Sequence, residues 1–500
     1  MKSIFQSAYS KYFILGLVLI ITTAWFSKGF HHPDEQFQIL EFANYKLGNS
    51  PSADLPWEFA AKIRPGLQPY LAYIFIKSLN YFGVENPFTL AFLLRLITAI
   101  CCWFVVSKLI LLLLPNFSTE KGKKIFIFLS LFLWFIPYIN VRFSSENMAA
   151  ISFLLAIYLL LKIYRNPSVE KISMFITGLL LSFSFFFRFQ MAFAIIGLGL
   201  WLIFVNKITW YKWLILVFSG LIGVIICVYL DKWLYGTWQF TPYNYYVANI
   251  VTGVAASFGV SPWWYYLNLF FLRAIPPLSL VLLCFFTVGV YKKPLHVFSV
   301  VAVCFLIGHF MVGHKEMRFL FPIWFLFTYL AAIGCDFYLK NYRINTFAKY
   351  GFILLVAINS LLLLFRTFFP AQEALDCYSY VYRHFRSKPP VNMYCINEPL
   401  YSLSGIKTSF YRQKNINEIV FKSEVELLEA LKKNHFDSVY VFKRKAALTG
   451  ELSTYKSERI YSVYPNWVLK FNISNWQERA NIWSIYLIHN KKKLPIYIKN

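Results

Sequence analysis

The sequence predicts a polytopic α-helical membrane protein of about eleven transmembrane helices, followed by a small soluble α+β domain. Of the 500 residues, 58% are hydrophobic and 14% are charged, which is not the composition of a soluble protein. Many apolar runs approach the ~20 residues that a helix needs to cross a bilayer. The composition becomes polar after Pro370, so we expect a membrane domain over residues 1–370 and a soluble domain over residues 371–500 on the extracytoplasmic or lumenal side. In the soluble domain we expect strands over residues 438–442 and 467–471 and a helix over residues 423–433.

The expected spans follow from the apolar runs taken in order. They are residues 12–26, 88–114, 125–139, a run ending near 162, 172–187, a run returning toward 207, 214–230, a run ending at 291, 295–312, 319–339 and 350–369. The first run lacks a clear small-residue cleavage site, so we expect a retained span and not a signal peptide. Two long loops interrupt the series, residues 28–87 and 231–264, and we expect short helices along the membrane interface in the first.

Basic residues set the orientation of these spans. They gather in loops that all fall on the side of the N-terminus, which the positive-inside rule places in the cytoplasm. These basic loops are residues 121–124, 162–171, 207–212, 292–293 and 340–349. The loops 28–87, 139–146, 231–264 and 313–318 fall on the opposite side. Anchoring of this kind and attraction to anionic lipid account for the net charge of +26, so no nucleic-acid partner is expected.

Two polar segments lie at span ends on that opposite side. The first polar segment, residues 30–38, reads Phe-His-His-Pro-Asp-Glu-Gln-Phe-Gln and follows the first span. The second polar segment, residues 314–319, reads His-Lys-Glu-Met-Arg-Phe and lies between two other apolar runs. Charge at a bilayer edge is costly unless it is paired, solvated or used. We therefore predict that the two segments form one active site.

The carboxylates of the first polar segment are Asp34 and Glu35. Because the two residues are adjacent, their side chains diverge on a helix or a strand, which argues against a dyad that shares one proton. One carboxylate acting as a general base while the other makes a hydrogen bond or an ion pair is the more natural arrangement. Acids at a membrane edge also serve as helix caps or salt-bridge partners, and this structural alternative stays open.

The second polar segment offers positive charge from His314, Lys315 and Arg318, with Glu316 as an internal partner. Such a cluster could bind a lipid-linked phosphate and stabilise its growing charge as it leaves. Contact with lipid headgroups is the ordinary alternative for basic residues at a bilayer surface. The sequence has no GxxxxGK[ST], no GxGxxG and no Asp-x-Asp motif, which favours a membrane-borne donor over a soluble nucleotide.

An ordered set of motifs runs through residues 15–370. It comprises His32-Pro33-Asp34-Glu35 with Gln38 and Glu41, Trp57-Glu58 with Ile63-Arg64, Arg142 to Asn147-Met148, Arg188-Phe189-Gln190, Asp231 with Tyr235-Gly236, Asn249, Gly259 with Pro262-Trp263 and Tyr266, and His314-Lys315-Glu316 with Arg318-Phe319 and Pro322. The set resembles glycosyltransferase family 22, the Alg-nine-like and GPI-type mannosyltransferases of the GT-C superfamily. Its first and last members are the most specific.

The resemblance implies a GT-C fold and an inverting transfer of mannose from a polyprenyl- or dolichyl-phosphate carrier to a lipid-linked glycan. The partners it implies are a lipid-phosphate-linked sugar donor, a lipid-linked glycan acceptor and membrane lipids. It requires no metal and no cofactor. Two rival functions remain open, a transporter or flippase of lipid-linked sugars and an oligosaccharide or O-antigen ligase. We see no internal repeat of the kind that transporters often carry.

The resemblance also implies roles for single residues. Asp34 would be the general base, and Glu35 would help to orient the acceptor or the sugar. The donor phosphate would face His314, Lys315 and Arg318. The further residues expected to contact substrate are His32, Glu58, Arg64, Asp231 and Tyr235.

Two expectations concern the environment of the protein. The composition, rich in lysine, isoleucine and asparagine, and the compact loops favour a bacterial inner membrane over an endoplasmic reticulum membrane, with the active site on the periplasmic or lumenal side. If that side is oxidising, Cys377 and Cys395 could form a disulfide, and two free thiols are the alternative.

Overall fold

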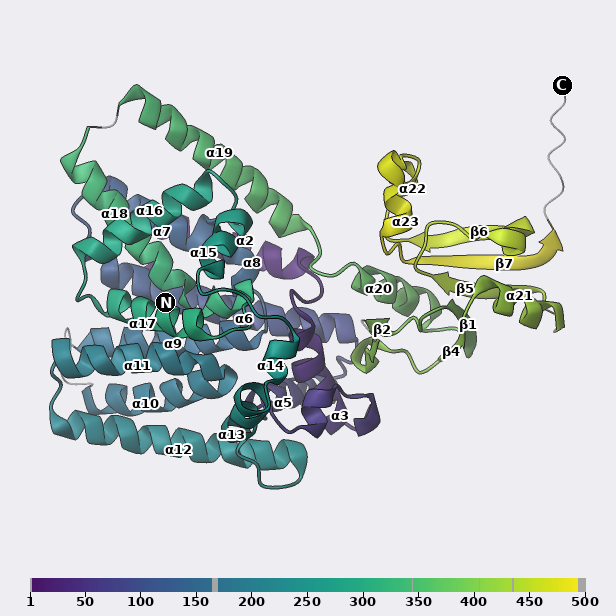
Figure 1. Ribbon diagram of the computed structural model, residues 1–500, viewed down its shortest axis with the longest axis horizontal. Helices are drawn as coiled ribbons and strands as arrows, with labels where there is room; N and C mark the ends of the chain where they lie inside the picture. The colour runs from purple at the N-terminus through teal and green to yellow at the C-terminus, as the bar shows by residue number, and fades with distance from the viewer. Residues whose placement is uncertain (1, 164–169, 344, 404, 434–435, 493–500) are drawn as a thin grey trace.

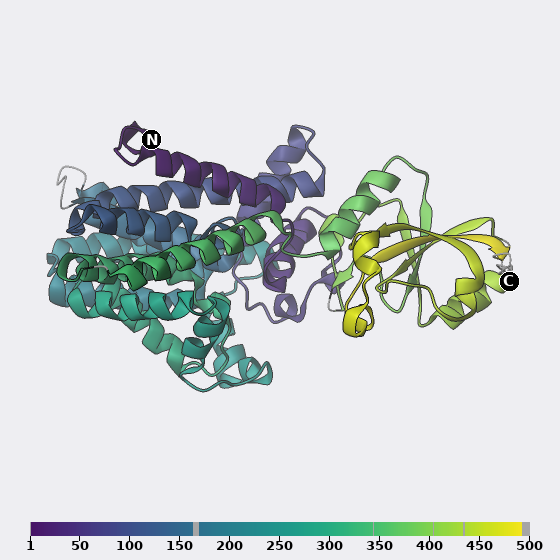
Figure 2. The ribbon, with the colours of Figure 1, turned by 90° about the horizontal axis from the view of Figure 1, so that it is seen from above.

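The computed structural model describes residues 2–163, 170–343, 345–403, 405–433 and 436–492. A bundle of long helices makes up most of the molecule, and a smaller part built on a β-sheet stands at one end of the bundle (Figure 1). The view from above in Figure 2 separates the same two parts. The expected helical membrane protein with a C-terminal α+β part is therefore confirmed.

Six helical stretches of the described residues are long and apolar enough to cross a membrane. They are Pro87–Asn116 with α6 (Pro87–Leu113), α9 (Ser145–Ile163), α10 (Glu170–Phe187), α12 (Trp210–Tyr235), Met317–Asn341 with η8 (Met317–Ile323) and α18 (Trp324–Asn341), and α19 (Thr346–Phe368). The shorter apolar helices are α2 (Ser10–Phe26), Phe189–Val205 with α11 (Ala192–Leu200), α16 (Leu278–Lys292) and α17 (Val297–Met311). These correspond to ten of the eleven expected spans.

The expected span over residues 125–139 is wrong as a single helix. α7 (Glu120–Phe132) ends before Trp134, and the short helix α8 (Ile136–Asn140) follows it. Asn359, on α19, donates to the carbonyl of Phe132 over 2.9 Å and accepts from the backbone N–H of Trp134 over 2.9 Å. Backbone groups inside a membrane domain need partners, and this side chain supplies them where the helix breaks.

The first long loop is more helical than expected. It holds η1 (Glu35–Leu40), α3 (Glu41–Lys46), α4 (Trp57–Ala60) and α5 (Leu67–Tyr81). α5 packs against α10 and α12 and does not merely lie along the interface. A Cβ atom at Gly66, which precedes α5, would lie 2.3 Å from the carbonyl oxygen of Leu230, so only glycine permits this close approach.

The second long loop begins later than expected. α12 continues to Tyr235 and ends at Gly236, which has φ 72° and donates its N–H to the carbonyl of Lys232 over 2.8 Å. Asp231 and Tyr235 therefore lie on the last turns of a helix and not in the loop. The rest of the loop and the chain after it form the short helices α13 (Thr241–Tyr246), α14 (Val254–Ser257) and α15 (Tyr265–Arg273).

The C-terminal part contains a mixed five-stranded sheet in the order β4-β1-β5-β7-β6. β1 pairs in parallel with β4 and β5, whereas β7 runs antiparallel to β5 and β6. The elements are α20 (Ala374–Phe385), β1 (Val391–Ile396), β4 (Ile416–Phe421), α21 (Glu424–Lys433), β5 (Ser438–Lys443), β6 (Tyr455–Ser462) and β7 (Ser484–Lys492). The expected strand at 438–442 and helix at 423–433 are confirmed.

The expected strand over residues 467–471 is wrong. This stretch begins in the helical turn α22 (Asn466–Leu469), where the carbonyl of Pro465 accepts from the N–H of Val468 over 3.0 Å. Trp467 and Phe471 are exposed, so their apolar character does not reflect a place in the sheet.

An apolar cluster joins the C-terminal part to the first long loop. Phe30 and Phe37 from the loop pack with Tyr378 and other side chains of α20 and the sheet. Cys377 and Cys395 are buried in the same cluster, and both thiols are free. The α+β part therefore rests on the end of the bundle that carries the first polar segment.

Candidate active site

The two polar segments meet in the structure. Arg318 Nη1 lies 2.7 Å from Asp34 Oδ2, and both side chains are largely buried. Asp34 stands at the start of η1, directly after the first membrane helix, and Arg318 lies in η8, directly before α18. The shared membrane face predicted from the basic loops is consistent with this contact.

Arg318 binds three carboxylates. Besides Asp34, its Nε lies 2.5 Å from Glu316 Oε2 and its Nη1 lies 3.2 Å from Glu146 Oε1. Glu146, in the first turn of α9, also receives Arg188 Nη1 at 3.4 Å. Charges buried this deeply are stable only when paired, so the cluster holds these elements in one arrangement.

Two histidines extend the cluster. His32 Nδ1 lies 3.2 Å from Asp34 Oδ1, and its Nε2 lies 3.5 Å from Glu316 Oε2. His314 Nδ1 lies 3.1 Å from the carbonyl of Gly259, and its Nε2 lies 2.9 Å from Glu316 Oε1. Because both ring nitrogens of His314 face acceptors, both bonds form together only when the ring is protonated and positively charged.

Lys315 points toward two backbone oxygens, one in the second long loop and one at the end of α17. Its Nζ donates to the carbonyl of Ser261 over 3.2 Å and to the carbonyl of Val312. Burial lowers the pKa of the Lys315 ammonium. Among the described residues it makes no ion pair, so its charge can attract an anion.

Arg64 and Glu58 approach Asp34 from the other side. Arg64 Nη2 lies 4.0 Å from Asp34 Oδ2 and 3.7 Å from Glu58 Oε1, and Gln38 donates to Glu58 Oε1 over 3.2 Å. Gln38 and Arg64 line a second, small hollow together with Arg188. The predicted substrate residues His32, Glu58 and Arg64 are thus all part of the cluster around Asp34.

Glu35 faces away from this cluster, as expected for neighbours on a helical turn. Its Oε1 accepts the N–H of His31 over 3.1 Å, and its Oε2 lies 4.0 Å from Arg142 Nη1. Arg142 is fully buried and donates to the carbonyls of Gly29 and Ser27 over 2.7 and 2.5 Å. Glu35 therefore helps to fix the turn that presents Asp34.

Asp231 and Tyr235 contact the backbone of the first long loop. Asp231 accepts from the N–H of Gly66 over 2.7 Å and from the Thr241 hydroxyl over 2.7 Å. The Tyr235 hydroxyl donates to the carbonyl of Arg64 over 2.7 Å. The structure places them behind Arg64, where they position the loop, and their contact with substrate stays a prediction.

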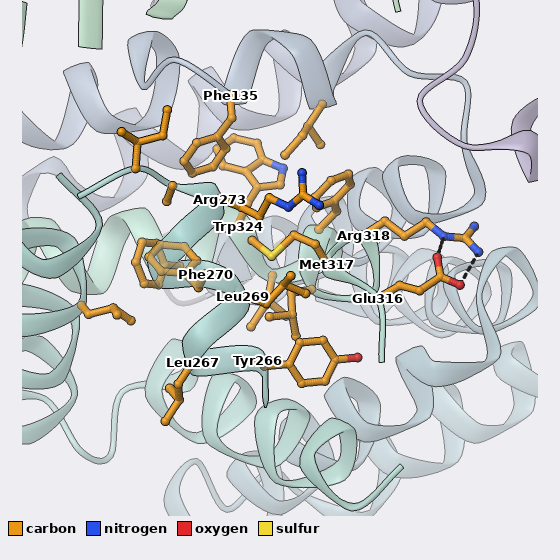
Figure 3. A pocket seen from close by; sticks show the side chains of 18 of the residues that line it. Phe135, Tyr266, Leu267, Leu269, Phe270, Arg273, Glu316, Met317, Arg318 and Trp324 are labelled. Carbon is orange, nitrogen blue, oxygen red and sulfur yellow. Dashed lines mark hydrogen bonds and ion pairs between the residues drawn. The ribbon is translucent and has the colours of Figure 1, made fainter. Parts of the chain in front are cut away.

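A cavity of about 780 Å³ opens beside the cluster. Its walls are mostly apolar and come from α15, α16, α18 and α19, while His32, Lys315, Glu316 and Arg318 also line it. Figure 3 shows the aromatic and aliphatic side chains around the hollow, with the Glu316–Arg318 pair at its edge. Such a shape suits a ligand with an apolar chain and an anionic head.

Neighbouring cationic side chains keep the carboxylates of Asp34 and Glu316 ionised. Burial alone would raise the pKa of Asp34, but Arg318, His32 and Arg64 hold that pKa well below its usual range. Burial is likewise outweighed at Glu316, whose pKa Arg318 and His314 lower to about 2. By contrast, burial raises the pKa of Glu35 to about 7 because its cationic neighbour Arg142 compensates only in part. Of the adjacent pair, Asp34 is therefore the carboxylate that is fully ionised at neutral pH.

Sequence reasoning did not single out Glu146 as a site residue. The signal was a charged residue at the start of an apolar run, which in a membrane protein marks a paired or functional group. Its partner Arg188 belongs to the ordered set of motifs, and the structure brings Arg188 within 3.4 Å of Glu146.

Together, the apolar helices and a buried ionised cluster at the mouth of an apolar cavity define a multi-pass membrane protein with an enzyme-like site. Residues 11–403 match the model of the Alg9-like mannosyltransferase family, and the chain belongs to that family.

Two relatives are similar to this chain in sequence over about two thirds of its length. GPI mannosyltransferase 3 of Candida albicans is 27% identical over 343 residues, 67% of this chain and 65% of that protein. GPI alpha-1,2-mannosyltransferase 3 of Bos taurus is 23% identical over 353 residues, 69% of this chain and 61% of that protein. The match thus spans less than two thirds of these relatives. Both come from eukaryotes, so the expected bacterial membrane stays a prediction.

The fold resembles that of ArnT from Cupriavidus metallidurans, solved in complex with undecaprenyl phosphate. The TM-score is 0.53 at 10% identity, with 96% of this chain and 98% of that chain covered. At this identity the likeness shows a common fold.

Proposed function

We propose that this protein transfers mannose from a polyprenyl- or dolichyl-phosphate carrier to a lipid-linked glycan, with Asp34 as the general base. The observation that carries the proposal is the position of Asp34, which binds Arg318 on one side and approaches Arg64 on the other. Arg318 lines the large apolar cavity, and Arg64 lines the small hollow. A carboxylate held by arginines at the charged end of a lipid-shaped space suits proton transfer beside a lipid-linked phosphate.

In this mechanism the carrier chain lies in the apolar cavity and its phosphate lies at the charged end. An acceptor hydroxyl oxygen attacks the anomeric carbon of the mannosyl group while the bond from that carbon to the phosphate oxygen breaks. The bonding electrons leave with the carrier, which becomes a phosphate monoester, and the hydroxyl proton passes to Asp34. A single displacement of this kind inverts the configuration at the anomeric carbon.

The surrounding side chains stabilise the leaving group and orient the reacting groups. Lys315, Arg318 and His314 stabilise the charge that develops on the leaving phosphate. His32 orients the Asp34 carboxylate. Arg64, held by Glu58, would contact hydroxyls of the sugar or the acceptor beside Asp34. Because Asp34 stays ionised at neutral pH, its carboxylate can accept a proton.

The relatives support the sugar and the ArnT structure supports the carrier. The two aligned relatives are named mannosyltransferases, and the ArnT structure contains undecaprenyl phosphate. A fold built around a polyprenyl phosphate fits the mostly apolar cavity of this chain.

The test is mannosyl transfer by the purified full chain in detergent. Mannosyl-phosphoryl-polyprenol should give an acceptor lipid heavier by one hexose, whereas GDP-mannose should give none. Transport across a membrane has no meaning in detergent, so product formation excludes a flippase as the sole activity. Transfer from GDP-mannose alone, or the addition of a whole oligosaccharide, would contradict the proposal.

A further inference from the structure

Glu316 fills the charged end of the cavity. Its Oε2 lies 2.5 Å from Arg318 Nε and 3.5 Å from His32 Nε2, while its Oε1 lies 2.9 Å from His314 Nε2 and 3.3 Å from Arg318 Nη2. Both oxygens are therefore occupied by donors from both polar segments. A guanidinium with two imidazoles beside it is also a set of donors that binds phosphate well.

The ion pairs of the cluster already occupy the donors that a phosphate would contact at Arg318 and His314. In the part of the chain that the structure describes, three arginines pair with four carboxylates in the connected network. The arginines are Arg64, Arg188 and Arg318, and the carboxylates are Asp34, Glu58, Glu146 and Glu316. A phosphate can bind Arg318 and His314 favourably only if one carboxylate withdraws.

Glu316 is the carboxylate best placed to withdraw. Its side chain is 27% exposed, compared with 16% for Asp34 and 3% for Glu146. It lies between the end of α17 at Met311 and the start of η8 at Met317, outside any helix, and it lines the cavity. Rotation of this side chain would free the guanidinium of Arg318 without breaking a helix.

We propose that Glu316 occupies the donor-phosphate subsite while the site is empty and that the carrier phosphate displaces it on binding. This inference rests on the proposed function. We call the displaceable side chain of Glu316 the gate. When the reaction leaves a phosphate monoester, which carries more negative charge than the diester donor, the returning Glu316 competes for the same donors. Competition of this kind weakens binding of the spent carrier and favours its release.

Binding of undecaprenyl phosphate to the purified full chain tests the gate without requiring turnover. In Glu316→Gln the competing negative charge is gone, so the dissociation constant should fall about tenfold, since a single hydrogen bond to a charged group commonly accounts for that factor. Glu316→Ala should also bind more tightly, which covers the case in which glutamine disturbs local packing. Glu316→Asp keeps the charge and should bind like the wild type.

Glu120→Gln is the matched control, because Glu120 is a carboxylate at the start of α7, outside this network, and should leave the affinity unchanged. Under turnover conditions, Glu316→Gln should lower KM and also lower kcat, because release becomes slower. The gate is refuted if the wild type binds undecaprenyl phosphate but folded Glu316→Gln and Glu316→Ala bind it no more tightly. If the wild type does not bind this lipid at all, the proposed donor class fails, and the gate fails with it.

Discussion

Arg318 donates to Asp34 over 2.7 Å across 284 positions of sequence. The contact joins the turn after the first membrane helix to the turn before α18, and it brings the carboxylate proposed as general base to the charged end of an apolar cavity. Glu146 and Glu316 complete the surroundings of the same guanidinium. The reaction proposed for this family member depends on that geometry.

Arg318→Lys should reduce donor-dependent transfer at least tenfold. Lysine keeps the positive charge, but a single ammonium cannot span the three carboxylates that the planar guanidinium contacts. The loss should fall mainly on kcat/KM for the lipid donor. Steady-state kinetics with varied mannosyl-phosphoryl-polyprenol measure it, and Arg343→Lys, an exposed residue distant from the cluster, is the control. Unchanged kcat/KM in Arg318→Lys would contradict the assignment.

Asp231→Ala should destabilise the protein without weakening donor binding. The substitution removes the acceptor of the Gly66 N–H and of the Thr241 hydroxyl, which should cost about 1–3 kcal/mol. Thr241→Val removes one of these bonds and should have a smaller effect. Thermal unfolding and undecaprenyl phosphate binding measure the two properties separately. A variant with normal thermal stability and lost lipid affinity would return Asp231 to the role of a direct substrate contact.

Glu41 should make the docking of the C-terminal part sensitive to pH. Both oxygens of Glu41 accept from the N–H of Phe410 at 3.1 Å, and Gln36 donates to Oε1 over 2.8 Å. Burial raises the pKa of Glu41 from 4.5 to about 7. Between these values the folded protein holds a proton that the unfolded chain has lost, so stability falls as pH rises through this window.

Glu41→Gln should lose this dependence, because glutamine does not titrate. The measurement is thermal unfolding, or limited proteolysis of the C-terminal part, at pH 5 and pH 8 in both proteins. The wild type should lose more stability than the variant on the alkaline side. Parallel behaviour of the two proteins would show that Glu41 does not titrate as proposed. Other groups of raised pKa, such as Glu35, are common to both proteins and cancel in the comparison.

The sequence could predict that the two polar segments converge, because the apolar runs between them and the positions of the basic loops can be read along the chain. The adjacency of Asp34 and Glu35 likewise predicted that their side chains point in different directions. Composition could not tell which of the two would face Arg318, since that depends on the helical turn of η1 and on the position of Arg142 beside Glu35.

Other features needed the fold itself. The break between α7 and α8 depends on Asn359, more than two hundred positions away, so periodicity over residues 125–139 could not reveal it. The distinction between Asp231 as a substrate residue and as a loop anchor depends on the Gly66 N–H at 2.7 Å, a backbone partner that no motif records.

Glu35→Gln and Asp34→Asn form the matched pair that isolates the general base. The two residues are neighbours, both are buried, and both substitutions remove one carboxylate without changing side-chain size. Glu35 contacts the backbone of His31 and lies beside Arg142, so Glu35→Gln should keep most of the transfer rate. Both variants should still bind undecaprenyl phosphate, which separates a loss of chemistry from a loss of the site.

The most direct measurement is the rate of mannosyl transfer from mannosyl-phosphoryl-polyprenol by purified Asp34→Asn protein. Removal of a general base typically costs a factor of about 10² to 10⁴, so the rate should fall by at least a hundredfold while lipid phosphate binding persists. Transfer by Asp34→Asn at a rate near that of the wild type would contradict the account.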